Sequence, residues 1–349
     1  MKTAVTLQDL AFLDPGGMFG CVAGWGLRAG SAHARARVAL AGWPEASPVP
    51  ASVLMVGMGG SAISADVATE FLGGRWPVRL GVHRGTGLPA WVDRETTVVA
   101  LSYSGDTGET LSAVDEAVAR GCPVVALTCG GQLGARMAAA GGRVLALEPG
   151  WQPRAAMGEI LFTLLALLGH WGAPLDSGPA LAHAAAWGEA LAGGVPEDHP
   201  ALALARFLAD SPDAWPVIVG VGGVTGAVAA RLRGQLAENA KCLASSTVLP
   251  EGTHNDLVPL ALDRHREAVL VACRDPEEDP WLARQADVAL AVTGRSLHEL
   301  RSCHPDALAR LVENVLVGDL ASVLLAWMRR VDPSPIEPIV TLKQRLRHS

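Results

Sequence analysis

Apolar runs alternate along the chain with segments of helical spacing. Short runs that are apolar at nearly every position are typical of strands buried on both faces, and helices between such strands are typical of parallel sheets. The first half of the chain contains five such runs, at 53–57, 78–82, 97–101, 123–127 and 143–147. The second half contains four, at 217–221, 246–249, 268–272 and 288–292. We therefore expect an α/β protein with parallel sheets.

An internal repeat divides the chain into two similar halves. The pattern Gly-x-Gly-Gly occurs at 57–60 and again at 220–223, each time after an apolar strand and before a helical segment. This repeat predicts two doubly wound parallel-sheet domains, whose ligands bind beyond the carboxyl ends of the strands. The expected organisation is an N-terminal helical segment at 1–39, a first domain at 40–175 and a second domain at 195–349 that closes with a C-terminal helix.

Composition narrows the class of protein. The chain has 349 residues, of which 50% are hydrophobic and 18% are charged, so it can bury the cores of about two ordinary domains. The net charge is −7 and the basic residues are scattered, which argues against a nucleic-acid partner. The N-terminus lacks the apolar run of a secretory signal, and the longest apolar run, near 160–169, is shorter than a membrane span. We expect a soluble cytoplasmic protein with no membrane partner.

The six cysteines show no spacing that is typical of a metal site. None lies in a Cys-x-x-Cys pair, and no histidine pair accompanies them at zinc spacing. Cysteine is among the residues most often buried in protein cores. We therefore expect buried free thiols and no bound metal.

Three hydroxyl side chains follow the strand at 97–101. Ser102, Ser104 and Thr107 surround Gly105, and a helical pattern starts at Glu109. Peptide N–H groups at the start of a helix are unpaired and attract anions, above all phosphate. The segment contains no lysine, which favours the phosphate monoester of a small metabolite over a triphosphate. One hydroxyl would suffice to cap the helix, so three of them together predict an anion site.

The first glycine turn allows a different ligand. Residues 57–62 fit a relaxed dinucleotide fingerprint, Gly-x-Gly-x-x-Ala, which is a weak signal alone. The next strand offers no acid for a ribose hydroxyl, but Arg84 could receive the 2′-phosphate of NADP. Close packing between strand and helix would explain Gly57 and Gly59 equally well. An NADP-dependent reductase thus stays open at this point.

Two further residues have both a functional and an ordinary interpretation. Glu238 belongs to the charged segment 231–241 and could be a solvated helix residue. His254 lies in the segment Gly-Thr-His-Asn-Asp after an apolar strand, where an exposed imidazole can titrate near neutrality or pack locally. Composition alone does not decide between these interpretations.

Considered together, six short segments carry a family resemblance. They are 58–61, 102–107, 152–154, 235–241, 254–256, and the C-terminal Asp332-Pro333 with Lys343. In this order they resemble the sugar isomerase (SIS) superfamily, and within it the bifunctional phosphoglucose/phosphomannose isomerases. The chain departs from the family pattern at Asp106, Gly108 and Asp256, where the family more often has Asn, Glu and Glu.

The resemblance implies SIS-type, flavodoxin-like domains and a reaction. That reaction is the reversible aldose–ketose isomerisation of glucose 6-phosphate or mannose 6-phosphate to fructose 6-phosphate through an enediolate. It needs no metal or organic cofactor, because one proton moves within one substrate. The alternative within the superfamily is a non-catalytic regulator that binds sugar phosphates. Retention of Glu238 and His254 weighs against that alternative.

The resemblance also implies a role for each site residue. Glu238 would be the base, and Arg154 would lie near the enediolate oxygens. His254 would open the sugar ring from a neighbouring subunit, which implies a homodimer, and Lys343 would close the site. The expected substrate- and phosphate-binding residues are Gly59, Gly60, Ser61, Ser102, Ser104 and Thr107.

Overall fold

A computed structural model describes residues 3–43, 49–263 and 267–347. These residues form two compact units, which we name by their sheets. The first-sheet unit comprises the described residues of 24–188 and 304–312. The second-sheet unit comprises the described residues of 1–23, 189–303 and 313–349. The domain boundaries expected from the sequence stay a prediction.

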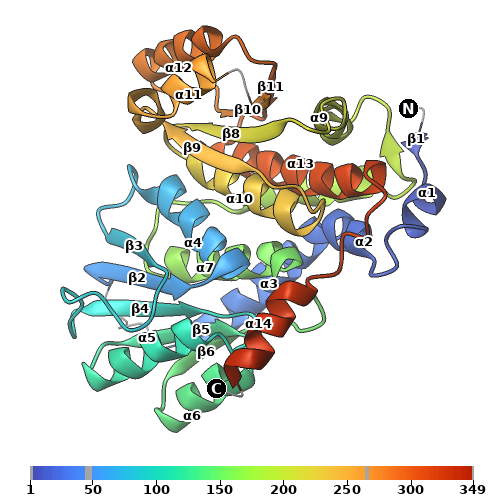
Figure 1. Cartoon of the computed structure of the whole chain (residues 1–349). Coiled ribbons are helices and arrows are strands. Elements are labelled where there is room, and N and C mark those ends of the chain that lie inside the picture. Colours follow the sequence, from blue (N-terminus) through green and yellow to red (C-terminus); the bar gives the residue numbers. More distant parts are fainter. Residues whose placement is uncertain (1–2, 44–48, 264–266, 348–349) are drawn as a thin grey trace. The chain divides into compact units, whose positions relative to one another are not determined.

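The first-sheet unit contains a five-stranded parallel sheet. Its strands are β2 (Ser52–Gly57), β3 (Arg79–His83), β4 (Thr96–Leu101), β5 (Val124–Thr128) and β6 (Arg143–Ala146). Its helices are α3 (Trp25–Ala41), α4 (Gly59–Leu72), α5 (Gly108–Ala119), α6 (Gly131–Ala139), α7 (Met157–His170), most of α8 (Gly178–Ala190) and the short 3-10 helix η1 (Pro153–Ala155). The strand order is β3-β2-β4-β5-β6, with α3, α4 and α7 on one face and α5 and α6 on the other (Figure 1). This is the doubly wound, flavodoxin-like order, which reverses between β2 and β4.

The second-sheet unit repeats this topology with four parallel strands. They are β8 (Trp215–Val221), β9 (Ser245–Leu249), β10 (Ala268–Arg274) and β11 (Leu297–Arg301), in the order β11-β10-β8-β9. Two short strands, β1 (Thr3–Val5) and β7 (Val195–Pro196), form a separate antiparallel pair. The helices are α1 (Leu7–Ala11), α2 (Met18–Ala23), α9 (Pro200–Ala209), α10 (Thr225–Glu238), α11 (Leu257–Leu262), α12 (Pro280–Thr293), α14 (Glu337–Arg347) and the 3-10 helix η2 (Glu251–His254). The predicted fold class, with its C-terminal helix, is confirmed.

One predicted strand is wrong. Residues 288–292 form the end of α12, which starts where the Asp279 carboxylate accepts hydrogen bonds from the N–H groups of Trp281 and Leu282. The helix ends at Gly294, whose φ is 61°. A short apolar run cannot by itself distinguish a strand from part of a helix. The fourth strand is instead β11, an edge strand with polar residues that the apolar pattern does not reveal.

The helix α13 (Ala307–Met328) begins in residues of the first-sheet unit and continues in the second-sheet unit. Its 22 residues are long and apolar enough to cross a membrane by length and composition, but 83% of its most apolar window is buried within the protein. Arg310, Glu313, Asn314 and Asp319 interrupt its sequence, so it does not form an unbroken apolar run. Such burial is typical of the core helix of a globular protein.

The cysteines only partly follow the expectation of buried thiols. Cys122, Cys242 and Cys273 are buried, Cys21 and Cys129 are half-buried, and Cys303 is exposed. No disulfide forms among these six described residues. The expectation was wrong for Cys303, because the chain at that point has left the edge strand β11 and lies at the surface.

A buried ion pair joins α10 to α13 in the second-sheet unit. The Nε and Nη2 atoms of Arg231 donate to the two carboxylate oxygens of Asp319 at 2.9 and 2.8 Å, and both residues are buried. Two parallel hydrogen bonds of this kind fix the relative rotation of the helices as well as their distance. The pair therefore sets the position of α10, whose last residue is Glu238.

We predict that Asp319→Asn lowers the free energy of unfolding by about 3 kcal/mol or more, because it leaves the buried guanidinium without its counter-charge. Chemical denaturation measures this loss. The control is Asp66→Asn, which disrupts the more exposed pair of Asp66 with Arg84 and should cost less than about 1 kcal/mol. Equal losses for the two variants would contradict the prediction.

Candidate functional site

The turn after β2 and the loop after β4 emerge side by side in the first-sheet unit. Gly57 at the end of β2 is paired with Leu101 at the end of β4. A Cβ on Gly57 would lie 2.8 Å from the Leu101 carbonyl oxygen, so only glycine allows this approach. Gly59 follows with a φ of 52°, in the left-handed region that glycine favours. The carboxyl ends of these two strands form the topological switch point, where ligands of such sheets bind.

The serine loop, residues 102–107, has an internal hydrogen-bond network. The Ser102 hydroxyl donates to Thr107 Oγ1 at 3.0 Å and accepts from the Gly105 N–H at 3.2 Å. Ser104 is exposed, and its hydroxyl accepts from the Asp106 N–H at 3.3 Å. Thr107 occupies the cap position of α5, yet within the described chain its side chain makes no capping hydrogen bond. The first N–H groups of α5 therefore stay open to an anion, with hydroxyls beside them.

Arg154 reaches this edge of the sheet from η1, just before α7. Its residue is only 3% exposed. A Cβ on Gly60 would lie 3.0 Å from the Pro153 carbonyl oxygen and 3.3 Å from Arg154 Cα, so the start of α4 packs directly against η1. Ser61, in the first turn of α4, is also buried. A cation is thus held next to the glycine turn.

The first-sheet unit accordingly brings together seven of the expected site residues. They are Gly59, Gly60, Ser61, Ser102, Ser104, Thr107 and Arg154. The other three, Glu238, His254 and Lys343, belong to the second-sheet unit. The roles of all ten residues, and the assembly of the seven with the three, stay predictions.

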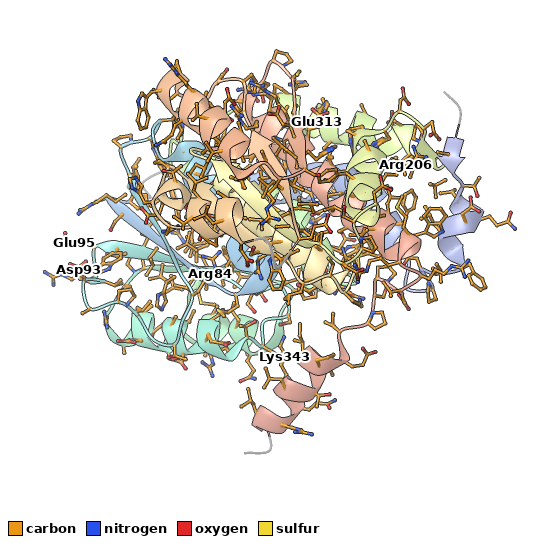
Figure 2. All side chains as sticks on the ribbon, turned by 45° about the horizontal axis from the view of Figure 1, so that its top comes forward. Arg84, Asp93, Glu95, Arg206, Glu313 and Lys343 are labelled. Carbon is orange, nitrogen blue, oxygen red and sulfur yellow. The ribbon has the colours of Figure 1, made fainter. Side chains whose placement is uncertain are left out.

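Within the second-sheet unit, a lysine ties Glu238 to the C-terminal segment. Glu238 is half-buried at the end of α10, and its carbonyl oxygen accepts from Lys241 Nζ at 2.6 Å. The same Nζ donates to the Pro333 carbonyl oxygen at 3.1 Å. Pro333 precedes α14, which carries the exposed Lys343 (Figure 2). Lys241 therefore links the backbone of Glu238 to the segment that precedes α14, the helix that carries Lys343.

His254 ends η2, directly after β9, and its side chain is exposed. Like the serine loop, it lies beyond the carboxyl end of a parallel strand. Exposure leaves its imidazole available to a group outside the unit.

The arginine that could serve a dinucleotide has another partner. The Arg84 guanidinium contacts both carboxylate oxygens of Asp66 on α4, with Nη1 at 3.1 Å from Oδ1. A 2′-phosphate would have to compete with this bidentate pair, which weighs against the NADP alternative. Among the described residues, no group of three His, Cys, Asp or Glu side chains is placed to hold a metal ion.

Sequence reasoning missed one buried carboxylate close to this edge. Glu159 on α7 is 1% exposed, pairs with Arg35 on α3, and accepts from the Glu148 N–H at 2.8 Å. It thereby holds the segment that leads from β6 to Arg154. The available signal was an acidic residue at the start of an otherwise apolar helix, since a buried acid requires partners.

Residues 197–346 match the family model described as the bacterial phospho-glucose isomerase C-terminal SIS domain. A bifunctional phosphoglucose/phosphomannose isomerase of Caldicellulosiruptor bescii is 33% identical over 308 residues, which cover 84% of this chain and 89% of that protein. The chain belongs to this family. The bifunctional phosphoglucose/phosphomannose isomerase of Thermoplasma acidophilum is 30% identical, with 84% and 89% of the two chains covered. The resemblance seen in the sequence motifs is confirmed.

A solved structure of a hypothetical protein from Thermus thermophilus shares the fold. Its TM-score is 0.71 at 18% identity, and the match covers 95% of this chain and 91% of that chain. At this identity the likeness concerns the fold alone.

We predict that Asp106→Asn tightens the binding of inorganic phosphate about two- to fivefold, because the substitution removes a negative charge that repels phosphate from the serine loop. Asp106 Oδ1 accepts from the Gln132 N–H at 3.1 Å, and an asparagine oxygen can preserve that bond. Isothermal titration calorimetry measures the change.

The matched control is Asp93→Asn. Asp93 Oδ1 also accepts a backbone N–H, from Glu95, but it precedes β4 at the opposite end of the strands (Figure 2). Its phosphate affinity should equal that of the wild type. Unchanged affinity in Asp106→Asn would argue against an anion at this loop.

Proposed function

We propose that this protein interconverts fructose 6-phosphate with glucose 6-phosphate and mannose 6-phosphate. The observation that carries the proposal is the 33% identity to a bifunctional phosphoglucose/phosphomannose isomerase over 84% of the chain. The open start of α5 beside three hydroxyls supports a phosphorylated substrate. In a family whose members are named as isomerases, a purely regulatory role is not favoured.

The phosphate would bind at the serine loop. Ser104 and the first N–H groups of α5 face outward, while the buried Ser102 hydroxyl holds Thr107 in place by donating a hydrogen bond to its side chain. Gly59 and Gly60 let the backbone approach the sugar, with Ser61 at the edge of the site. This arrangement holds the phosphate end of the substrate, which does not react. The binding energy gained there orients the carbon that does react.

The chemistry would be a proton transfer between adjacent carbons. Glu238 removes the proton from C2 of the open-chain aldose and the electron pair forms an enediolate. The O2 hydroxyl proton moves to O1, and the proton held by Glu238 returns at C1 to give the ketose. Arg154 would stabilise the negative charge that develops on the enediolate oxygens. Its buried, packed position suits this role, because a fixed cation needs no rearrangement as the charge appears.

His254 would open the sugar ring from a second copy of the chain, with Lys343 closing the site. An exposed apolar face on α11 and α12 supports a homodimer near His254, because large apolar patches mark protein contacts. Its most exposed members are Val258, Leu262, Trp281, Val288 and Val292. Thr253, next to His254, lines the same groove as Trp281. We place the protein in the cytoplasm, where sugar phosphates are metabolised.

A coupled assay tests the function directly. Fructose 6-phosphate is supplied and each aldose phosphate is detected with its own dehydrogenase system. We expect both aldose phosphates to form without added metal or cofactor. Formation of neither by the folded protein would overturn the proposal.

We predict that Glu238→Gln lowers kcat by about 10³-fold or more while leaving the affinity for fructose 6-phosphate within about threefold, because the amide cannot accept the C2 proton. Exchange of the C2 hydrogen with deuterated solvent, followed by NMR, measures the step itself. Glu95→Gln, at the opposite end of the strands, serves as the control and should exchange at the wild-type rate. Persistent exchange in Glu238→Gln would remove this residue as the base.

A mixing experiment tests the shared histidine. Glu238→Gln and His254→Ala should each be inactive with fructose 6-phosphate. If His254 acts in the neighbouring subunit, a mixed dimer regains one intact site, and an equal mixture should recover about a quarter of the wild-type activity by random pairing. Activity that stays at the level of the single variants after dissociation and reassociation would assign His254 to its own chain.

A further inference from the structure

Tyr103, the one tyrosine of the chain, lies in the serine loop between Ser102 and Ser104. Unlike Ser104, its side chain points inward and is only 6% exposed. The phenol hydroxyl donates to the Glu148 carbonyl oxygen at 2.7 Å and accepts from the Trp151 N–H at 3.1 Å. One side chain of the serine loop therefore fixes two backbone groups of a distant segment.

That segment, residues 148–154, is the one that presents Arg154. Between Trp151 and Arg154 the chain forms a single turn, in which the Gln152 carbonyl oxygen accepts from the Ala155 N–H at 2.8 Å. The start of the segment is held from the other side, where the Glu148 N–H donates to the buried Glu159. The Arg28 guanidinium lies 4.0 Å from the centre of the Trp151 ring. The segment is thus held at its start and at Trp151, and the phenol joins both points to the serine loop.

We propose that Tyr103 is a positioning residue that couples occupation of the serine loop to the placement of Arg154. The inference rests on the proposed function, in which the loop binds phosphate and the guanidinium faces the enediolate. Phosphate bound beside Ser102 and Ser104 restrains the backbone on both sides of Tyr103. The hydrogen bonds of the Tyr103 hydroxyl extend that restraint to Glu148 and Trp151. Binding of the phosphate end of the sugar then fixes the position of Arg154 at the reacting end.

The protonation state of the phenol suits this role. Burial raises the pKa of Tyr103 above its ordinary value. A phenol keeps its proton at neutral pH even without this shift, so the hydroxyl can donate to Glu148 while it accepts from Trp151. A phenylalanine would fill the same space but leave that carbonyl oxygen and that N–H without the hydroxyl.

The test is Tyr103→Phe in the full-length protein. We expect kcat for fructose 6-phosphate to fall about tenfold or more with KM changed less than about threefold, because phosphate still binds while Arg154 is misplaced. The matched control is Ser52→Ala, which removes a buried hydroxyl bonded to Thr96 Oγ1 at 3.2 Å, at the opposite end of the same sheet. The control should keep both constants. Wild-type kcat in Tyr103→Phe, or an equal loss in Ser52→Ala, would overturn the proposal.

A second measurement does not depend on turnover, and its wild-type arm does not require a folded variant. Hydrogen exchange of the wild-type peptide that covers 148–154 is followed by mass spectrometry with and without inorganic phosphate. We expect phosphate to slow exchange there severalfold, and to lose that effect in Tyr103→Phe. If phosphate protects the serine loop but not 148–154, the coupling is absent. If the coupling is present but the wild type forms no aldose phosphate, the proposed function fails and the role of Tyr103 stands on phosphate alone.

Discussion

The pairing of β2 with β4 is the constraint on which the candidate site depends. Strands that are neighbours in a parallel sheet end at the same edge, and the chain leaves these two in opposite directions around the sheet. The glycine turn and the serine loop therefore lie next to each other, because they follow two directly paired strands. Side chains at Gly57 or Gly60 would push this edge apart, since their Cβ atoms would meet Leu101 and Pro153. Packing of this edge therefore requires glycine at both positions, whether or not a ligand binds there.

Within that frame, the hydroxyls and the helix amides have separate tasks. If Thr107 capped α5 with its side chain, an anion would find the first N–H groups already occupied. Thr107 instead accepts a hydrogen bond from Ser102, and that bond keeps its oxygen next to the amides without satisfying them. In the proposed function, the site neutralises a phosphate with dipoles and hydroxyls, and the buried Arg154 remains for the other end of the substrate. This division explains why no lysine is needed in the loop.

Most of the fold follows from local signals in the sequence, whereas its long-range connections do not. Buried strands such as β4 and β8 are apolar at every position except their ends, so they are recognised without knowing their neighbours. Edge strand β11 has only two apolar residues among its five, and the apolar end of α12 was mistaken for a strand in its place. The loop hydroxyls were identified because they lie within six residues of one another in the sequence.

Contacts across the chain behave differently. Tyr103 meets a segment 45 to 48 residues away, and Lys241 meets Pro333, 92 residues away. Such contacts depend on strand order and on the path of each loop. No spacing in the sequence encodes them, because the same residues in another strand order would have other neighbours.

The two sheets share one topology, yet their equivalent edges have opposite chemistry. The helix that follows β10 corresponds to α5, but the Asp279 carboxylate caps its first N–H groups, and the preceding loop carries Asp275 and Glu278 in place of hydroxyls. In the second glycine turn, a Cβ on Gly222 would lie 2.3 Å from Leu282 Cδ2, so that turn is filled by α12. An anion meets satisfied amides at this edge, beside carboxylates of which Glu278 already pairs with Arg274. We therefore expect phosphate to bind at the first sheet alone, and in the proposed function the second copy of the fold instead supplies Glu238 and His254 for the chemistry.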